Sequence, residues 1–298
     1  MEYIEGYFKG VDDLDIYYRN YKVEDSIETI VISHGFCETS EKYSDFIKDL
    51  TDKNYSVYIL DHRGHGKSGR LGKDNSQIYV NSFNDYVSDL KTLLDEVILK
   101  DENNNDLILF GHSMGGAISA LFLQNHNDYF KRAILNAPML EIHTGNYSEQ
   151  FTKIVAKIYC SLKLEKSYVL GHEPFNIEKC SLKGSGTSCE IRYNSYMDKI
   201  KNNEHLKLSG ASYKWLNEAF KTTDYVTDIN NIKKIEIPIL LFQAGIDSYV
   251  KPYKQNYFAQ NSKNCTLIIK ENAKHEIYIE KDEIRDEYMT DLFNFLEE

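Results

Sequence analysis

The chain has 298 residues, of which 42% are hydrophobic and 27% are charged, and its formal net charge is −11. This composition is typical of a globular protein with a substantial core, and it excludes a disordered chain. The negative charge argues against a nucleic-acid partner. Transient contact with a membrane surface stays open, because a local basic or apolar patch can act on an acidic protein.

The N-terminus and the cysteines give an expectation for location. Residues 1–5 lack the basic region and apolar stretch of a signal peptide, and no run approaches the roughly 18 apolar residues of a spanning helix. The five cysteines are odd in number and have no metal-ligand spacing. We therefore expect free thiols in a cytoplasmic protein that is at most peripheral at the membrane.

The predicted elements begin with a β-hairpin and continue as alternating strands and helices. The hairpin covers residues 3–8 and 14–18. Short β-rich runs follow at residues 28–33, 56–60, 107–110, 133–136, 237–242 and 266–269, and helical periodicity is found at 41–53, 83–98 and 284–296. This alternation predicts an α/β fold, with a mostly parallel, doubly wound sheet.

One interval interrupts the alternation. Between residues 139 and 227 no strand–helix unit is found, although the interval is rich in aromatic and amphipathic pieces. In a compact domain, an interval of this length is better explained by an inserted helical cap than by a loop. We therefore predict a core built from residues 1–138 and 228–298, with residues 139–227 as the cap.

The run at 107–110 breaks into a helix at Ser113, which lies between Gly111 and Gly115. A G-x-S-x-G pattern between a strand and a small-residue helix is typical of a nucleophile elbow, in which the serine backbone is strained and its hydroxyl is exposed. Side chains at the two glycines would collide with the neighbouring strand and helix. The alternative is a coincidental glycine turn.

A serine hydroxyl needs a base that is itself oriented. Among nine histidines, His275 follows the last predicted strand and precedes the closing helix, at the edge where open α/β sheets assemble their sites. Asp247 ends an apolar strand and lies between Ser113 and His275 in chain order, so it is the predicted orienting acid. Asp224 and Asp228 are rivals that are more simply explained as helix caps or solvated charges.

Two main-chain amides are expected to hold an oxyanion. The amide of Met114 begins the helix after Ser113, where unpaired N–H groups and the helix dipole favour negative charge. The amide of Phe36, after a strand and a His-Gly pair, supplies the second donor, and its phenyl ring is free to line an acyl pocket. This chemistry requires no metal and no organic cofactor.

Residues 61–68 carry two histidines, an arginine and two glycines. Their spacing differs from G-x-x-x-x-G-K-[ST] and gives a weak metal signal. We interpret this segment as a hydrogen-bonded turn after the strand at 56–60.

Several motifs occur in order between residues 25 and 297. They are His34-Gly35-Phe36-Cys37-Glu38 with Tyr43, Asp61-His62-Arg63-Gly64-His65-Gly66-Lys67-Ser68, Gly111-His112-Ser113-Met114-Gly115-Gly116, Gly245-Ile246-Asp247 and Lys274-His275-Glu276. Together they resemble the monoglyceride lipase and lysophospholipase group of the α/β-hydrolases. The resemblance implies that fold, with Ser113, Asp247 and His275 catalytic and with Phe36 and Met114 at the oxyanion hole.

Weaker features resemble the bacterial lysophospholipase branch. They are His275-Glu276-Ile277, Glu280-Lys281-Asp282, Arg285, Arg192-Tyr193, Gly210 and Tyr213-Lys214-Trp215. Two positions depart from the group, since Phe36 replaces its usual small residue and Cys37 stands where glycine is common.

These patterns predict a serine hydrolase that cleaves carboxylic esters of lipids, lysophospholipid or monoacylglycerol, through an acyl-enzyme. A general carboxylesterase or a peptidase of the same fold is the alternative, because a serine nucleophile does not separate esters from amides. A non-catalytic ligand-binding module is disfavoured, because all three triad positions are chemically competent.

A cap segment offers two interpretations. Ile154, Val155, Ile158, Tyr159 and Leu162 share a helical face, and Lys153, Lys157 and Lys163 lie largely off it. The helix either packs on the core with solvated lysines, which we prefer, or meets lipid aggregates with its lysines on anionic head groups.

Overall fold

The computed structural model describes residues 2–100 and 106–297. The strands in these ranges form one sheet in the order β1-β2-β4-β3-β5-β6-β7-β8. Their bounds are β1 (Ile4–Lys9), β2 (Asp15–Tyr21), β3 (Thr29–Ser33), β4 (Ser56–Leu60), β5 (Leu107–His112), β6 (Arg132–Asn136), β7 (Ile239–Ala244) and β8 (Cys265–Lys270). β2 pairs antiparallel with β1 and β4, and the other pairs are parallel, which confirms the mostly parallel α/β sheet.

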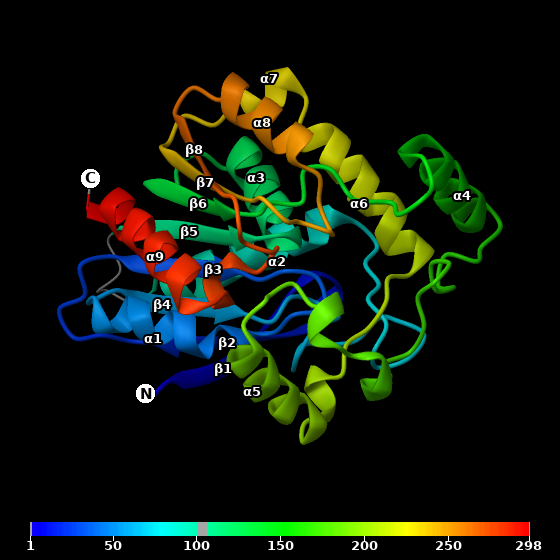
Figure 1. Cartoon of the computed structure of the whole chain (residues 1–298), viewed down its shortest axis with the longest axis horizontal. Coiled ribbons are helices and arrows are strands. Elements are labelled where there is room, and N and C mark those ends of the chain that lie inside the picture. Colours follow the sequence, from blue (N-terminus) through cyan, green and yellow to red (C-terminus); the bar gives the residue numbers. More distant parts are fainter. Residues whose placement is uncertain (1, 101–105, 298) are drawn as a thin grey trace.

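Helices cover both faces of this sheet (Figure 1). They are α1 (Ser44–Asp52), α2 (Phe83–Leu93) with a π-helical turn (Leu94–Ile98), α3 (Met114–Asn125), α4 (Glu149–Ser161), α5 (Glu190–Lys201), α6 (Tyr213–Val226), α7 (Ile229–Ile232), α8 (Pro252–Asn261) and α9 (Asp282–Glu297). Short 3-10 turns lie at Val11–Asp13, Ser40–Tyr43, Ile177–Lys179, Leu182–Gly184, Glu204–Leu206 and Ile277–Ile279.

Two apolar clusters fill the spaces between the sheet and its helices. Side chains of α2, α3 and α6 pack on one face, and those of α1 and α9 pack on the other. Every residue of β3, β4, β5 and β7 is buried, as expected for central strands covered on both sides. The aliphatic runs in the sequence therefore mark the central strands, of which β3, β5 and β7 end shortly before Phe36, Ser113 and Asp247.

The interval between β6 and β7 is helical, with no named strand in the described structure. α4 and α5 lie outside the two helical layers (Figure 1). α6 differs, because Trp215, Leu216 and Phe220 join the same apolar cluster as α2 and α3. The helical content predicted for residues 139–227 is confirmed, whereas the division into core and cap at 138/139 and 227/228 stays a prediction.

The histidine-rich segment at 61–68 forms a turn, as predicted. The carboxylate of Asp61 accepts hydrogen bonds from the amides of Ser40 at 2.6 Å and Lys67 at 2.9 Å, and His62 and His65 are buried. Within residues 2–100 and 106–297 there is no cluster of His, Cys, Asp and Glu suited to a metal ion. None of the described helices combines the length and apolar character needed to cross a membrane, and the five cysteines are unpaired.

Candidate active site

Ser113 occupies a tight bend between β5 and α3. Its backbone has φ 53° and ψ −117°, a left-handed conformation that costs a non-glycine residue about 1–3 kcal/mol. Main-chain bonds hold it there: its N–H donates to the carbonyl of Asn136 at 3.0 Å, and its own carbonyl accepts from the amide of Met139 at 2.9 Å. The strain predicted for an elbow serine is confirmed.

The two flanking glycines are required by close packing. A Cβ at Gly111 would lie 2.3 Å from Ser119 Oγ, and a Cβ at Gly115 would lie 1.9 Å from the carbonyl oxygen of Ser33. Real Cβ atoms do not approach other atoms so closely, so any side chain at Gly115 would push α3 away from β3. The predicted collisions are confirmed.

Asp247 and His275 meet at the ends of adjacent strands, β7 and β8. The ring nitrogen Nδ1 of His275 donates to Oδ2 of Asp247 at 2.7 Å, and both side chains are nearly buried. The other carboxylate oxygen accepts from the amides of Tyr249 at 2.8 Å and Val250 at 3.0 Å. Burial alone would raise the pKa of Asp247, but His275 and these amides outweigh it, so the pKa is lowered and the acid stays ionised.

The rival aspartates are engaged elsewhere. Asp224 pairs with Lys153 on α4, and the side chain of Asp228 accepts from the amide of Asn230 as the cap of α7. Both roles are those of helix caps and surface charges. Neither aspartate bonds to His275.

One cavity of about 1010 Å³ joins the predicted site residues. Ser113, His275 and Phe36 line it, and Met114 is buried at the first position of α3. The ring of Phe36 packs on Trp215 with 4.3 Å between centroids. Ser113, His275 and Phe36 therefore meet at this cavity, and Met114 lies in the first turn of α3, where N–H groups have no partner within the helix. Asp247 does not line the cavity and bonds to His275 in its wall.

His112 is a neighbour of both predicted catalytic residues but bonds elsewhere. Its Nδ1 contacts the carbonyl of Asn136 at 3.0 Å, and its ring lies 4.8 Å from the ring of His275. Burial lowers the pKa of His112 to about 3, so the ring is neutral at physiological pH. The neutral ring of His112 therefore packs against the ring of His275.

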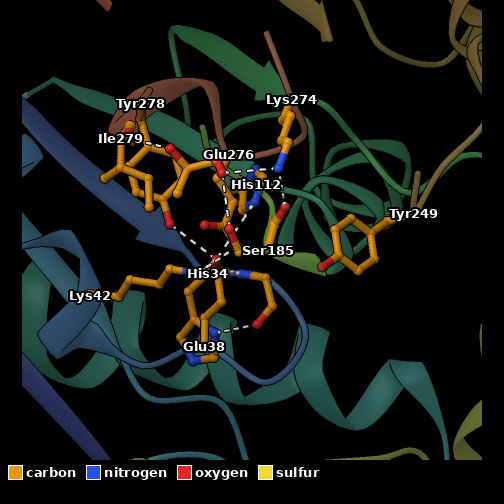
Figure 2. Close-up of polar contacts among 12 residues, drawn as sticks. His34, Glu38, Lys42, His112, Ser185, Tyr249, Lys274, Glu276, Tyr278 and Ile279 are labelled. Carbon is orange, nitrogen blue, oxygen red and sulfur yellow. Dashed lines mark hydrogen bonds and ion pairs between the residues drawn. The ribbon is translucent and has the colours of Figure 1, made fainter. Parts of the chain in front are cut away.

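A buried carboxylate organises the Phe36 loop. Glu38 accepts from the amide of Gly35 at 2.8 Å, from the hydroxyls of Tyr43 at 2.7 Å and Tyr278 at 3.0 Å, and from Lys42 at 2.9 Å. Figure 2 shows Glu38 and Lys42 beside His34 at the start of this loop. Glu38 was predicted only as a member of a motif, without a role of its own. The spacing of four residues between Glu38 and Lys42 is the signal in the sequence that could have indicated their ion pair.

Lys42 joins Glu38 to the loop of His275. Its ammonium lies 2.6 Å from Glu276 and 2.9 Å from Glu38, and all three side chains are mostly buried at the cavity wall. Burial acts to lower the pKa of Lys42, but the carboxylates of Glu276 and Glu38 outweigh it and raise it. Burial likewise acts to raise the pKa of Glu38, which Lys42 and its other partners lower. Lys42 and Glu38 therefore stay charged together.

The rest of the cavity is largely apolar. Its apolar wall includes Val155, Tyr159, Leu208, Trp215 and Leu216. Glu38, Lys42 and Glu276 line the same cavity and are called here its polar arm, and the apolar residues just named are called its apolar arm. Such a cavity fits an amphiphilic molecule whose reactive bond lies between its apolar and polar parts.

Comparison with known proteins decides the family. Residues 24–282 match the family described as serine aminopeptidase, S33. The chain belongs to this family. It is 30% identical over 294 residues to lysophospholipase L2 of Escherichia coli strain K12, an alignment that covers 94% of this chain and 84% of that protein. It is 26% identical over 266 residues to the monoglyceride lipase homolog of Monkeypox virus, covering 88% and 87% of the two chains.

Solved structures share the fold of this S33 family member. A soluble variant of monoglyceride lipase from Saccharomyces cerevisiae superposes with a TM-score of 0.77 at 19% identity, covering 98% of this chain and 94% of that one. A carboxyl esterase from Bacillus coagulans gives a TM-score of 0.77 at 17% identity, covering 100% and 98%. The chain therefore has the α/β-hydrolase fold and belongs to a family of serine hydrolases.

Proposed function

We propose that this protein hydrolyses carboxylic esters of lipids, lysophospholipid or monoacylglycerol, with Ser113, His275 and Asp247 as the catalytic triad. The observation that carries this proposal is the 2.7 Å bond between His275 and Asp247 at the wall of the cavity that also holds Ser113. The similarity to lysophospholipase L2 along most of both chains favours the lysophospholipid.

In the proposed mechanism His275 takes the proton of Ser113 while the serine oxygen attacks the ester carbonyl. Asp247 keeps the proton of His275 on Nδ1, so that Nε2 is the base, and stabilises the imidazolium that forms. His275 then gives its proton to the leaving alcohol. Water activated by the same ring hydrolyses the acyl-enzyme and restores Ser113.

The amides of Phe36 and Met114 are the proposed oxyanion donors. Met114 supports this role as the first residue of α3, where the helix dipole favours negative charge. Glu38 supports it indirectly, because its bond to the amide of Gly35 fixes the main chain immediately before Phe36.

The two arms of the cavity supply the proposed orientation of the substrate. The leaving alcohol must lie near His275, which protonates it, and therefore beside Glu276 and Lys42. The acyl chain then extends along Trp215 and Leu216. A substrate with a polar head and one long chain satisfies both requirements, whereas a short ester leaves the apolar arm empty.

We also propose transient contact between the cap and lipid aggregates. α4 and its flanking residues expose an apolar ridge, in which Tyr147, Phe151, Ile154, Ile158 and Leu162 are 48% to 63% exposed. Tyr147 and Phe151 also line the cavity, so the ridge is continuous with the substrate entrance. The expectation that the lysines of this helix are solvated is wrong for Lys153, because its ammonium is paired with Glu149 and Asp224. The ridge is therefore proposed to act through its apolar side chains.

Vesicle co-sedimentation tests the ridge. The double variant Ile154→Asp, Ile158→Asp should lose binding to vesicles of phosphatidylcholine and phosphatidylglycerol. Ile191→Asp, at an isoleucine of α5 that is 81% exposed, is the matched control and should bind like the wild type. Equal sedimentation of all three proteins would contradict the contact.

Labelling and turnover test the triad. Ser113→Ala should lose ester hydrolysis and covalent labelling by a fluorophosphonate while its circular dichroism is unchanged. Ser161→Ala, at an exposed serine of α4, should keep both. Labelling of Ser113→Ala at another residue would refute the assignment.

A substrate panel separates the lipid esterase from its alternatives. Lysophosphatidylcholine and monoacylglycerol of equal chain length should have the highest kcat/KM, above a short nitrophenyl ester and above an aminoacyl amide. Preference for the short ester would favour a general carboxylesterase. Preference for the amide would favour a peptidase, which the description of the matched family keeps as the second candidate.

A further inference from the structure

One lysine next to the predicted catalytic base is surrounded by main-chain carbonyls of the cap. The ammonium of Lys274 lies 3.2 Å from the carbonyl oxygens of Leu182, Ser185 and Thr187 and 3.4 Å from that of Lys183. Figure 2 shows Lys274 reaching to Ser185. The residues 182–188 are called here the anchor segment. Four carbonyl contacts to one ammonium fix this segment directly against the residue that precedes His275.

A buried carboxylate holds the same segment from the other side. Glu280 is 0% exposed and accepts from the amides of Lys274 at 3.0 Å and Ser188 at 3.1 Å, and from the hydroxyl of Ser188 at 2.6 Å. A buried carboxylate is tolerated only when such donors replace its water. Lys274 therefore binds the carbonyls of the anchor segment while Glu280 binds its last amide and hydroxyl.

Further bonds attach the anchor segment to both loops of the Asp247–His275 pair. The amide of Glu276 donates to the carbonyl of Gly186 at 2.7 Å, and the hydroxyl of Tyr249 donates to the carbonyl of Gly184 at 2.8 Å. A Cβ at Gly186 would lie 2.6 Å from the side chain of Glu276, so a larger residue here would displace that side chain. The His275 loop and the Asp247 loop are thus both fastened to one stretch of the cap.

The next helix of the cap is tied to the same loop. Arg192 of α5 donates to the carbonyl of Glu280 at 2.6 Å and to Asp282 at 2.7 Å. Arg192, Glu280 and Asp282 belong to the sequence features that the triad leaves without a role. Their contacts assign all three to the junction between the cap and the His275 loop.

We propose that Lys274 and Glu280 are positioning residues. By holding the anchor segment against the loop that carries His275, they fix the orientation of the His275 ring. The inference rests on the proposed function, because it assumes that His275 is the base. Proton transfer requires the ring nitrogen within hydrogen-bond reach of the serine oxygen, and displacement by about 1 Å costs about 10²-fold in rate. Loosening the anchor segment lets the loop that carries His275 move and lowers the rate of the chemical step.

The coupling differs from a role in binding the acyl chain. If the junction only shaped the acyl pocket, its loss would raise KM for long-chain esters and leave short esters unaffected. If it positions His275, kcat falls for every ester, including nitrophenyl acetate, which is too short to use the apolar arm. The chain-length dependence of kcat and KM therefore distinguishes the two roles.

The test compares Lys274→Met, Glu280→Gln and the control Lys183→Met, at an exposed lysine of the anchor segment. Both junction variants should lower kcat about 10- to 100-fold for nitrophenyl acetate and for a long-chain ester, with KM within about twofold of the wild type. The control should match the wild type. Unchanged kcat on nitrophenyl acetate in both junction variants would overturn the proposal.

Chemical rescue guards against a variant that is merely misfolded. Lys274→Ala removes the part of the side chain that propylammonium replaces, so adding propylammonium should restore kcat toward the wild-type value, whereas propanol should not. Absence of rescue in a folded Lys274→Ala would count against the proposal. If the wild type itself hydrolyses no ester, the proposed function fails, which is a different outcome from an active wild type with unaffected junction variants.

Discussion

His275 and Asp247 lie 28 positions apart in the chain and 2.7 Å apart in space, at the ends of the neighbouring parallel strands β7 and β8. The parallel pairing brings the two loops to the same sheet edge, and the amides of Tyr249 and Val250 hold the free carboxylate oxygen. Asp247 is therefore held by the main chain of its own loop as well as by His275.

Replacing Asp247 by asparagine should lower kcat for lipid esters by about 10⁴-fold, because an amide holds the wrong imidazole tautomer. The melting temperature should change little, since the asparagine side chain retains an acceptor for the two amides. Asp224→Asn, at the exposed rival aspartate, should change kcat by less than about twofold. Similar losses in the two variants would refute the assignment of the acid.

The buried charges around Glu38 should be costly to break. Glu38→Gln leaves Lys42 with a single carboxylate and replaces one acceptor oxygen by an NH2 donor. Because Gly35 and Tyr43 share one oxygen of Glu38 and Lys42 and Tyr278 share the other, one of these two pairs loses its acceptor, so the free energy of unfolding should fall by about 3–5 kcal/mol. Urea denaturation measures this loss. Asp52→Asn removes the partner of Lys48 in an exposed pair and should leave the free energy of unfolding nearly unchanged. Equal costs would contradict the buried character of the cluster.

Acid should destabilise the protein through its buried imidazoles. Burial lowers the pKa of His34, His62, His65 and His112 in the folded state. Below the unfolded value of about 6.5 the unfolded chain therefore binds more protons than the folded one, so stability is full above that pH and falls as the pH drops further. Each such histidine contributes up to about 1.4 kcal/mol per pH unit.

Urea denaturation between pH 7 and pH 5 checks this slope. His62→Gln removes one titrating ring at the site that contacts Ser33 Oγ, and the fall in stability with decreasing pH should be shallower than in the wild type. His205→Gln, at an exposed histidine, should leave the pH dependence of unfolding unchanged. A slope in His62→Gln equal to that of the wild type would contradict the account.

The end of α4 offers a stabilising substitution. Lys163 follows the helix with φ 60°, its amide donates to the carbonyl of Cys160, and the amide of Leu164 donates to that of Tyr159, the bonds of a Schellman motif. Because glycine adopts this conformation without strain, Lys163→Gly should stabilise the cap by about 1 kcal/mol. Lys157→Gly, inside α4, should destabilise it by a similar amount. The rate of proteolysis of the cap measures both changes in stability. If the two variants change this rate in the same direction, the argument is refuted.

The sheet was predictable because its central strands are buried on both faces. Their aliphatic runs stand out between turn residues, and Ser113 and Asp247 follow two of them, whereas His275 follows the edge strand β8. Positions after the ends of parallel strands therefore predicted a common edge for the three residues. The need for glycine on both sides of Ser113 was also predictable, because the turn packs tightly against the neighbouring strand and helix. The pattern at 83–98 correctly predicted a helix but not its π-helical end.

The junction of the cap could not be read in the same way. Lys274 and Leu182 are 92 positions apart, and no periodicity links a lysine side chain to main-chain carbonyls of an irregular segment. The spacing of Glu38 and Lys42 indicates a local ion pair. The ion pair between Lys42 and Glu276 could not be predicted, because it depends on the conformation of the loop after β8. Irregular loops satisfy their polar groups through tertiary contacts, which sequence patterns do not encode.

The main-chain bonds of Ser113 have a dynamic consequence. Its amide donates to Asn136 at the end of β6 and its carbonyl accepts from Met139. We therefore expect the proposed nucleophile to belong to the unit of the molecule whose amides exchange with solvent only when the sheet itself opens. α4, with a single buried residue, belongs to the opposite end of the stability range. We therefore expect α4 to open locally at a lower free energy than the sheet, while Ser113 keeps its position.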